Sequence, residues 1–442
     1  MLKNPFTPSF IATAPDDFFG RSDELRVVKG ALAMGCVAIH GPIGIGKSSL
    51  LARAVLELEG FGGEGVAEAI TVTVHKDIKT IDEAARHVLE ALVDIDEAHR
   101  KVTFKIGSLF EHESGDVTRN FVAGRHLAAL TRILGRESLK AALKDRQLLI
   151  IAIDEADKCP IPLAQLVRAV TSDAQLAGVK SIRFLLAGVS PFYERMLEED
   201  QGIGRFVYRT ISLEPMTPED ASDLLRTKFE SVMDDAEDSG IALQIATDVI
   251  PRLVALSGGH PHILQLLGSY LVEHEDQDPD GIIDSKDLIS SLQRVCYQDR
   301  AKAYDAALHA LSVENKLEEL QQLLSLAGGR FPTRIPRTKA VDTVGPDVLT
   351  WFVDRDILSV PSAGSAQYGL VDEFLRIRLL LDSEQSEQSK QALEAEIVRS
   401  VSIEEFVEAE LASDNGDVAD YLEREAESAD EIDHPGDQDD EN

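Results

Sequence analysis

Eight residues near the N-terminus combine glycines with a lysine and a hydroxyl side chain. Residues 41–48 read GPIGIGKS, which fits the pattern G-x-x-x-x-G-K-[ST]. Glycines allow backbone N–H groups to turn inward around a phosphate, because they have no Cβ to obstruct a close approach. Lys47 brings a positive charge to β- and γ-phosphates, and the Ser48 hydroxyl is suited to bind Mg²⁺. This chemistry predicts a loop that holds the phosphates of a nucleotide.

An acidic pair, Asp154 and Glu155, directly follows a run of six apolar residues, 148–153. Such a run, without alternation, is typical of a parallel strand that is buried on both faces. An acid at the carboxyl end of a parallel strand points into the ligand crevice. We therefore expect Asp154 to complete the Mg²⁺ shell and Glu155 to orient or deprotonate an attacking water.

The elements around these residues form an alternating pattern. The phosphate loop lies between a short apolar strand at 36–40 and a helix that begins at Lys47, which is the context that supports the motif. The other expected elements are strands at 69–75 and 182–188 and helices at 21–34, 80–93 and 125–144. Ser22 is the expected N-cap of the first helix. Strands that alternate with helices predict an α/β fold with a parallel sheet.

The pattern changes after residue 215. Thr217 and Pro218 form a typical helix start, and the chain then reads as helices to about residue 300. Residues 301–383 predict three helices followed by a two-stranded hairpin, which is the order of a winged helix. The helices are expected at 301–312, at 315–326 and from Pro346, and the hairpin strands at 357–360 and 367–371.

The charge of the chain is concentrated near its C-terminus. The net charge is −34, and residues 401–442 contribute −16 of it through 17 acidic residues against Arg424. A strongly acidic chain repels phosphate backbones unless its basic residues cluster, so nucleic-acid binding starts as the less favoured class. Residues 384–442 are expected to form a largely disordered tail, helical in part at about 387–411.

Cysteine content and hydropathy bear on the compartment. Cys36, Cys159 and Cys296 lie far apart and show no metal-ligand spacing, and their odd number argues against a disulfide framework. The sequence also has no apolar run of 18 residues, so we expect neither a membrane span nor a membrane partner. These features favour the cytoplasm.

Over about residues 5–383 the chain resembles the AAA+ and STAND ATPases, and among them bacterial and archaeal ATPases related to origin-recognition initiators. Residues 18–25 (FFGRSDEL) look like the family's GR-x-x-E-L box, which lies near the adenine. Residues 257–261 (SGGHP) look like the GG-x-P signature of the STAND lid, and a final winged helix is also common there. The implied parts are a lead-in at 1–20, a P-loop AAA+ (ASCE) core at 21–214, a helical lid at 215–300, a winged helix at 301–383 and the tail at 384–442.

The resemblance implies ATP and Mg²⁺ as ligands and assigns roles to individual residues. The implied nucleotide contacts are Gly41, Pro42, Gly44, Ile45, Gly46, Lys47, Ser48 and Ser49 in the loop, with Phe19, Arg21 and Pro261 near the base. Ser48 and Asp154 would hold the metal. Ser190 falls where the family has the polar sensor that contacts the γ-phosphate, so Lys47, Glu155, Ser190 and Arg205 form the implied catalytic set.

Two features depart from the initiator pattern. The lid has no sensor arginine, since that place reads GGHP; His260 or His262 would substitute for it, or else serve only in packing. The arginine finger is the second question. Arg205 lies about where relatives have a finger, Arg209 is a rival, and either residue is also compatible with a structural surface arginine.

Three functions follow from these parts. The first is a nucleotide-dependent switch or assembly ATPase with a protein partner or a homo-oligomer, and STAND relatives act in signalling or defence. The second is a DNA-binding initiator or loader that uses its winged helix. The third, a binding module with a degenerate nucleotide site, is weakened because Lys47, Asp154 and Glu155 are all present.

The expected reading helix, from Pro346 to residue 356, is a poor match to a DNA groove. It holds three acids and one base, and Trp351, Phe352 and Val353 are expected to be buried. The basic residues just before it are Arg330, Arg334, Arg337 and Lys339. They would contact phosphates, form a solvated loop or dock on an acidic protein, and we favour protein contact over DNA contact.

Overall fold

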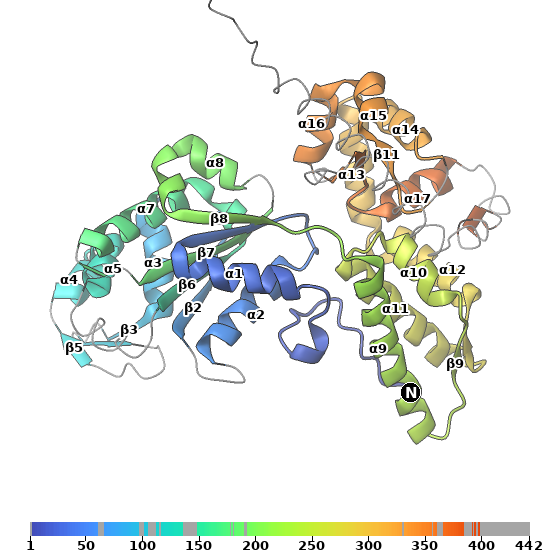
Figure 1. Cartoon of the computed structure of the whole chain (residues 1–442), viewed down its shortest axis with the longest axis horizontal. Coiled ribbons are helices and arrows are strands. Elements are labelled where there is room, and N and C mark those ends of the chain that lie inside the picture. Colours follow the sequence, from blue (N-terminus) through green and yellow to red (C-terminus); the bar gives the residue numbers. More distant parts are fainter. Residues whose placement is uncertain are drawn as a thin grey trace, which may run out of the picture. The chain divides into compact units, whose positions relative to one another are not determined.

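The computed structural model describes residues 2–60, 66–96, 101–104, 112–114, 116–135, 148–176, 178–179, 181–189, 192–328, 331–355, 357–359, 366–383, 391, 393–394 and 397. The chain forms two compact units. One is Thr7–Asp220, and the other combines Met1–Phe6 with Ala221–Asn442 (Figure 1).

The first unit is built on a five-stranded sheet in the order β2-β6-β7-β1-β8, and all of its pairings are parallel. The strands are β1 (Cys36–His40), β2 (Ala67–Thr73), β6 (Leu148–Asp154), β7 (Ile182–Gly188) and β8 (Val207–Ser212). The predicted α/β fold and the strands of the two motifs are confirmed. β8 was not expected, and β2 begins and ends two residues before its predicted range.

Helices cover both faces of this sheet (Figure 1). They are α1 (Ser22–Met34), α2 (Lys47–Glu59), α3 (Ile81–Leu92), α4 (Asp116–Val122), α5 (His126–Leu134), α7 (Pro160–Leu176) and α8 (Phe192–Glu199). Successive strand residues point to opposite faces, so Val37 packs with α1 and α2 while Ala38 packs with α3 and α7. A second, three-stranded sheet is antiparallel and consists of β3 (Val93–Asp96), β4 (Lys101–Phe104) and β5 (His112–Ser114).

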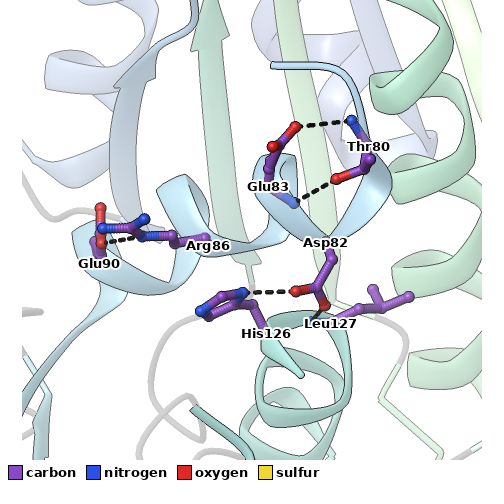
Figure 2. A network of polar contacts seen from close by, with 7 residues as sticks. All are labelled: Thr80, Asp82, Glu83, Arg86, Glu90, His126 and Leu127. Atoms are coloured by element: carbon purple, nitrogen blue, oxygen red, sulfur yellow. Dashed lines mark hydrogen bonds and ion pairs between the residues drawn. The ribbon is translucent and has the colours of Figure 1, made fainter. Parts of the chain in front are cut away.

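The N-termini of α3 and α5 are fixed to one another by polar contacts (Figure 2). Thr80 and Glu83 form a reciprocal capping box at the start of α3. The Asp82 carboxylate lies 2.6 Å from Nδ1 of His126 and accepts the Leu127 N–H at 2.9 Å. These contacts hold α5 against α3. The part of the predicted 125–144 helix beyond residue 135 lies outside the described residues.

The second unit contains the helices that follow β8. They are α9 (Pro218–Asp238), which starts in the first unit, α10 (Val249–Ser257), α11 (Pro261–Gln277) and α12 (Ser285–Arg294). The predicted start of α9 is confirmed, since Thr217 Oγ1 accepts the Asp220 N–H at 3.1 Å. The stretch is not purely helical, because β9 (Gln244–Ile245) and β10 (Ile282–Ile283) form a short parallel pair.

The N-terminal segment is part of this second unit. The Phe6 ring packs on Phe229 with ring centroids 5.0 Å apart, and it lies so close to Gly268 that a Cβ there would be 2.3 Å from the ring. The Asn4 side chain donates to the Ser269 hydroxyl at 2.9 Å. The Leu2 N–H donates to Asp276 at 2.8 Å. The expected extended lead-in is therefore partly an integral piece of the helical unit.

We expect Phe6→Ala to destabilise the helical unit by about 3 kcal/mol, because it removes a buried ring that no neighbouring side chain can replace. Chemical denaturation followed by circular dichroism would measure the loss. Phe10→Ala is the matched control, since Phe10 is 78% exposed and should change stability by less than about 0.5 kcal/mol. Equal, small effects of both substitutions would contradict the assigned packing of Phe6.

The last described part of the chain contains α13 (Ala301–Val313), α14 (Leu317–Ser325), α15 (Arg337–Val344), α16 (Pro346–Asp354) and α17 (Glu373–Ser383). Strand β11 (Ile335–Pro336) pairs antiparallel with β12 (Gln367–Tyr368), and Leu358 pairs with Leu370 beside it. The expected hairpin thus pairs at its described residues. The winged-helix domain and the other domain boundaries stay predictions.

Two expectations about this region need correction. Helix α15 was not predicted, and it has Arg337 and Lys339 in its first turn, so the solvated loop, one of the three alternatives for these residues, does not apply to them. Trp351 and Val353 are only half-buried, whereas Phe352 is fully buried. The Arg355 guanidinium lies over the Trp351 ring, 4.0 Å from the ring centroid, and covers part of it. Arg330 lies outside the described residues.

Candidate functional site

The phosphate loop has the backbone that its glycines predicted. Gly44 and Gly46 have φ values of 83° and 102°, in the left-handed region that favours glycine. A Cβ at Gly46 would meet no atom within 4 Å, so the space before the loop is open and a side chain would intrude on it. Lys47 Nζ donates to the carbonyls of Gly41 and Pro42 at 2.8 and 2.6 Å. The ammonium is thus held at the loop, where it can neutralise phosphate charge.

The loop is fixed to the body of the first unit at two points. At Gly41 a Cβ would lie 2.9 Å from the Leu213 carbonyl oxygen, so the chain after β8 packs directly on the loop. The Ile45 side chain is fully buried. Helix α2 begins at Lys47, and its unpaired N-terminal N–H groups and helix dipole favour an anion there. A fixed loop with an open, positive face fits a polyphosphate.

The sheet register brings the acidic pair to the same edge as the loop. Ile153 on β6 is level with Leu186 on β7, which in turn is level with Ala38 on β1. Asp154 is therefore level with Ile39, the residue before the end of β1. Two strand spacings separate these residues, a distance of about 10 Å. The carboxyl ends of β1 and β6 thus place the lysine loop and the carboxylate on one side of the sheet.

The acidic pair has an unusual backbone. Glu155 has φ 55° and ψ 36°, a left-handed conformation that is uncommon for residues other than glycine, and its side chain is exposed. Its N–H donates to Asp154 Oδ1 at 2.9 Å. This bond leaves Asp154 Oδ2 without a hydrogen bond to any described residue, so it is available to a cation. The strained position of Glu155 directs it away from the strand and is typical of a functional residue.

Arg21 fixes the loop to the end of the sheet. Its buried guanidinium donates to the carbonyl oxygens of Ile45 at 3.3 Å and Glu214 at 2.5 Å, and it pairs with Glu24 at 2.8 Å. Gly20 has φ 63° and lies so close to Asp220 that a Cβ there would be 2.6 Å from the Asp220 Cβ. Gly20 and Arg21 of the GR-x-x-E-L box therefore have a structural task at the phosphate loop.

A pocket of about 540 Å³ lies beside Arg21 and Glu214, within the first unit. Its lining includes Arg21, Ser22, Glu24, Ser212, Glu214 and Thr217. Ser212 and Glu214 flank Leu213, on which Gly41 packs. The pocket is thus adjacent to the start of the phosphate loop and offers oxygen acceptors for N–H and O–H donors. Phe19, the other predicted base contact, is half-buried next to Gly20.

The lid signature has a conformational explanation. Gly258 and Gly259 both have positive φ, 60° and 76°, and form the turn between α10 and α11. His260 is the N-cap of α11, and Pro261 is its first residue, where a missing N–H costs nothing. His260 is buried. The turn accounts for both glycines and the proline, and the contact of Pro261 with a base stays a prediction.

The remaining predicted catalytic residues are Ser190 and the two candidate fingers, Arg205 and Arg209. Ser190 lies outside the described residues. Arg205 and Arg209 are both exposed, and neither forms a hydrogen bond or ion pair with a described residue. Arg205 ends the short 3₁₀ helix Gln201–Arg205, and Arg209 lies on the edge strand β8. Both therefore remain candidates for a finger.

Two residues near the site were not predicted. Burial lowers the pKa of His40 at the end of β1, and the charge of Lys47 lowers it further, although Glu194 raises it. Asp157 accepts the Val189 N–H at 3.0 Å and so holds the end of β7 beside the acidic pair. Its position, two residues after Glu155, was the only hint in the sequence.

Comparison with known proteins agrees with this geometry. Residues 32–196 match a family model described as an AAA domain. The ORC2 protein of Aeropyrum pernix, solved with ADPNP and ADP, superposes with a TM-score of 0.52 at 12% identity, covering 90% of this chain and 98% of that chain. A Walker-type ATPase of Pyrococcus abyssi superposes with a TM-score of 0.51 at 14% identity, covering 84% and 99%. The chain thus has the α/β fold of a P-loop NTPase, and its residues 32–196 are similar to the AAA domain.

No curated protein matches the chain. None of the helices in the described part of the chain is long and apolar enough to cross a membrane. Cys36, Cys159 and Cys296 are buried free thiols.

Proposed function

We propose that this protein is a Mg²⁺-dependent ATPase in which nucleotide state controls assembly with a neighbouring subunit. The observation that carries the proposal is the arrangement at the carboxyl edge of the sheet. There the Lys47 ammonium follows β1, whereas Asp154, with one carboxylate oxygen not bonded to any described residue, and the strained Glu155 lie at the end of β6, on the same side of the sheet. AAA and ORC2-like relatives with the same fold support a nucleotide as the ligand.

The residues present suit the expected ligands. Lys47 and the N–H groups of the loop would bind the β- and γ-phosphates, and the Ser48 hydroxyl with Asp154 would hold Mg²⁺. When bound, that ion neutralises charge on the phosphate oxygens. Glu155 would orient a water molecule and accept its proton. The pocket next to Arg21 and Glu214 is the proposed place of the sugar or base.

Contact between subunits would control the rate of ATP hydrolysis. Arg205 and Arg209 are exposed cations without partners among the described residues. A cation that completes the site of another subunit stabilises charge in the transition state, so hydrolysis would depend on contact between subunits. We place Arg205 in this role. Turnover per subunit that rises with protein concentration is the experiment that tests it.

A second candidate function, DNA contact, is favoured by one observation. Arg337 and Lys339 occupy the first turn of α15 and are exposed. Cations at a helix N-terminus oppose the helix dipole and cost stability, whereas an anion at the same place is stabilised. A phosphate would therefore relieve an unfavourable arrangement. Arg334, exposed just before β11, would add a third cation.

If this surface contacts DNA, the double substitution Arg334→Glu and Arg337→Glu should weaken duplex binding at least tenfold at low salt. It should also flatten the dependence of affinity on salt, since each lost phosphate contact lowers that slope by about one. Fluorescence anisotropy over a salt series would measure both. Arg226→Glu on α9 is the matched control, an exposed arginine outside this surface. Absence of duplex binding by the intact protein at low salt would exclude the candidate.

A further inference from the structure

The short 3₁₀ helix Gln201–Arg205 presents Arg205 at its last residue, between α8 and β8. Asp200 caps this helix, because its Oδ1 accepts the Gly202 N–H at 2.9 Å. Ile203 anchors it in the core, and the Phe206 N–H closes it on the Ile203 carbonyl at 2.8 Å. The backbone that carries Arg205 is therefore fixed, while its side chain extends into solvent.

The Asp200 carboxylate is held by a second arginine. Arg168, on α7, places Nη1 at 2.7 Å from both carboxylate oxygens of Asp200. The hydrogen bond from Arg168 holds the pKa of Asp200 below its ordinary value, and the charge of Arg205 adds to this effect. Arg205 ends the same short helix that Asp200 caps, yet it makes no ion pair with Asp200.

The Asp200 carboxylate thus has one arginine in contact, Arg168, and a second, Arg205, five residues further along the chain. A carboxylate can accept two parallel N–H bonds from one guanidinium, and a free carboxylate near a flexible arginine attracts it. Asp200 is the residue that would capture Arg205 inside its own subunit. Because Arg168 already bonds both oxygens of Asp200 and neutralises its charge, the attraction of Asp200 for Arg205 is weakened.

We propose that Arg168 is a positioning residue that keeps Arg205 available to a neighbouring copy of the chain by occupying Asp200. The inference rests on the proposed role of Arg205 as a finger. Stability alone is a weak explanation for the pair, because half-exposed surface ion pairs contribute little to folding. What the pair achieves is to remove a competing partner of Arg205.

The test uses three variants of the full chain and measures ATP turnover per subunit at high protein concentration. Arg168→Ala frees Asp200, so turnover should fall about tenfold. Asp200→Asn keeps an amide oxygen for the Gly202 N–H but has no charge to attract Arg205, so its turnover should stay within twofold of wild type. The double substitution should restore most of the turnover that Arg168→Ala loses. A double variant no better than Arg168→Ala would overturn the inference.

Gln165→Ala is the matched control, because Gln165 lies one turn earlier on α7 and bonds Glu199 at 3.2 Å. It removes a neighbouring polar contact between the same helices and should leave turnover unchanged. A loss equal to that of Arg168→Ala would show that any contact here matters for structure, and would count against the inference.

Mixing subunits adds a readout that a general structural role would not move. Arg168→Ala subunits keep an intact loop and an intact Glu155, whereas Glu155→Gln subunits keep a free Arg205. In a mixture, Glu155→Gln subunits supply the finger to Arg168→Ala sites, and total turnover should rise several-fold above the sum of the separate activities. No rise would contradict the inference, since a captured Arg205 is the only defect that it assigns to Arg168→Ala.

Arg205→Ala separates this inference from the proposed function. If Arg205→Ala keeps wild-type turnover, the finger assignment fails and the inference fails with it. If Arg205→Ala lowers turnover at least tenfold but Arg168→Ala does not, the finger stands and only the role of Arg168 is overturned.

Discussion

Lys47→Ala should lower the affinity for ATP at least about a hundredfold, equivalent to about 2.7 kcal/mol. In the structure the Lys47 ammonium lies against the carbonyls of Gly41 and Pro42, at the mouth of the loop. Charge-assisted hydrogen bonds contribute about 1.5–3 kcal/mol each, and this side chain is expected to serve two phosphates. Isothermal titration with ATP and Mg²⁺ would measure the loss.

Lys29→Ala is the control for this experiment. Lys29 lies on α1 in the same unit and pairs with Glu57 at 2.6 Å, away from the loop. Its removal changes the net charge by the same amount and should leave the ATP affinity within twofold. Unchanged affinity in Lys47→Ala itself would refute the assignment of residues 41–48 as the phosphate site.

Glu155→Gln should bind ATP as the wild type does but hydrolyse it at least tenfold more slowly. The amide has the shape of the carboxylate and keeps the left-handed backbone at φ 55°, but it cannot accept a proton from water. General-base contributions of about 10²–10⁴-fold are usual, so tenfold is a lower bound. Single-turnover kinetics with a separate measurement of nucleotide affinity would distinguish the two steps.

A loss of affinity in Glu155→Gln would indicate that this residue serves in binding rather than in proton transfer. Wild-type turnover would place the base elsewhere, and Asp157 would be the next residue to test, because it holds β7 next to the acidic pair.

The parts of the fold that could be predicted from sequence are those that depend on local composition. β1 and β6 are buried on both faces and are apolar up to their last residue, and β7 is apolar except for Arg183. β8 was missed because it is an edge strand, in which only Val207 and Ile211 are buried. Helix α15 was missed for a similar reason, since Ala340 is its one buried residue.

Long-range contacts explain the other differences. The bond from Asn4 to Ser269 joins residues 265 positions apart, and no local pattern in residues 2–6 reveals a binding place on α9 and α11. The same limit applies to the site. The phosphate loop and the acidic pair could be predicted from the motif and the order of the strands. The hydrogen bond from Arg21 to the Glu214 carbonyl joins residues 193 positions apart and appears only in the folded chain.

The residues assigned by family resemblance differ in whether the fold alone explains them. The glycines and proline at 258–261 have a sufficient explanation in the turn between α10 and α11, so their presence does not require a base nearby. The exposed Arg205 and Arg209, by contrast, have no structural task within the described chain. Their exposure is what makes an intersubunit role worth testing.

The most direct test of the account is ATP turnover per subunit as the concentration of the protein is raised, with Glu155→Gln as the background control. If hydrolysis depends on assembly, turnover per subunit climbs with concentration and reaches a plateau, and Arg205→Ala removes the climb. Slow turnover that does not change with concentration, in a protein that still binds ATP through Lys47, would contradict assembly-dependent hydrolysis.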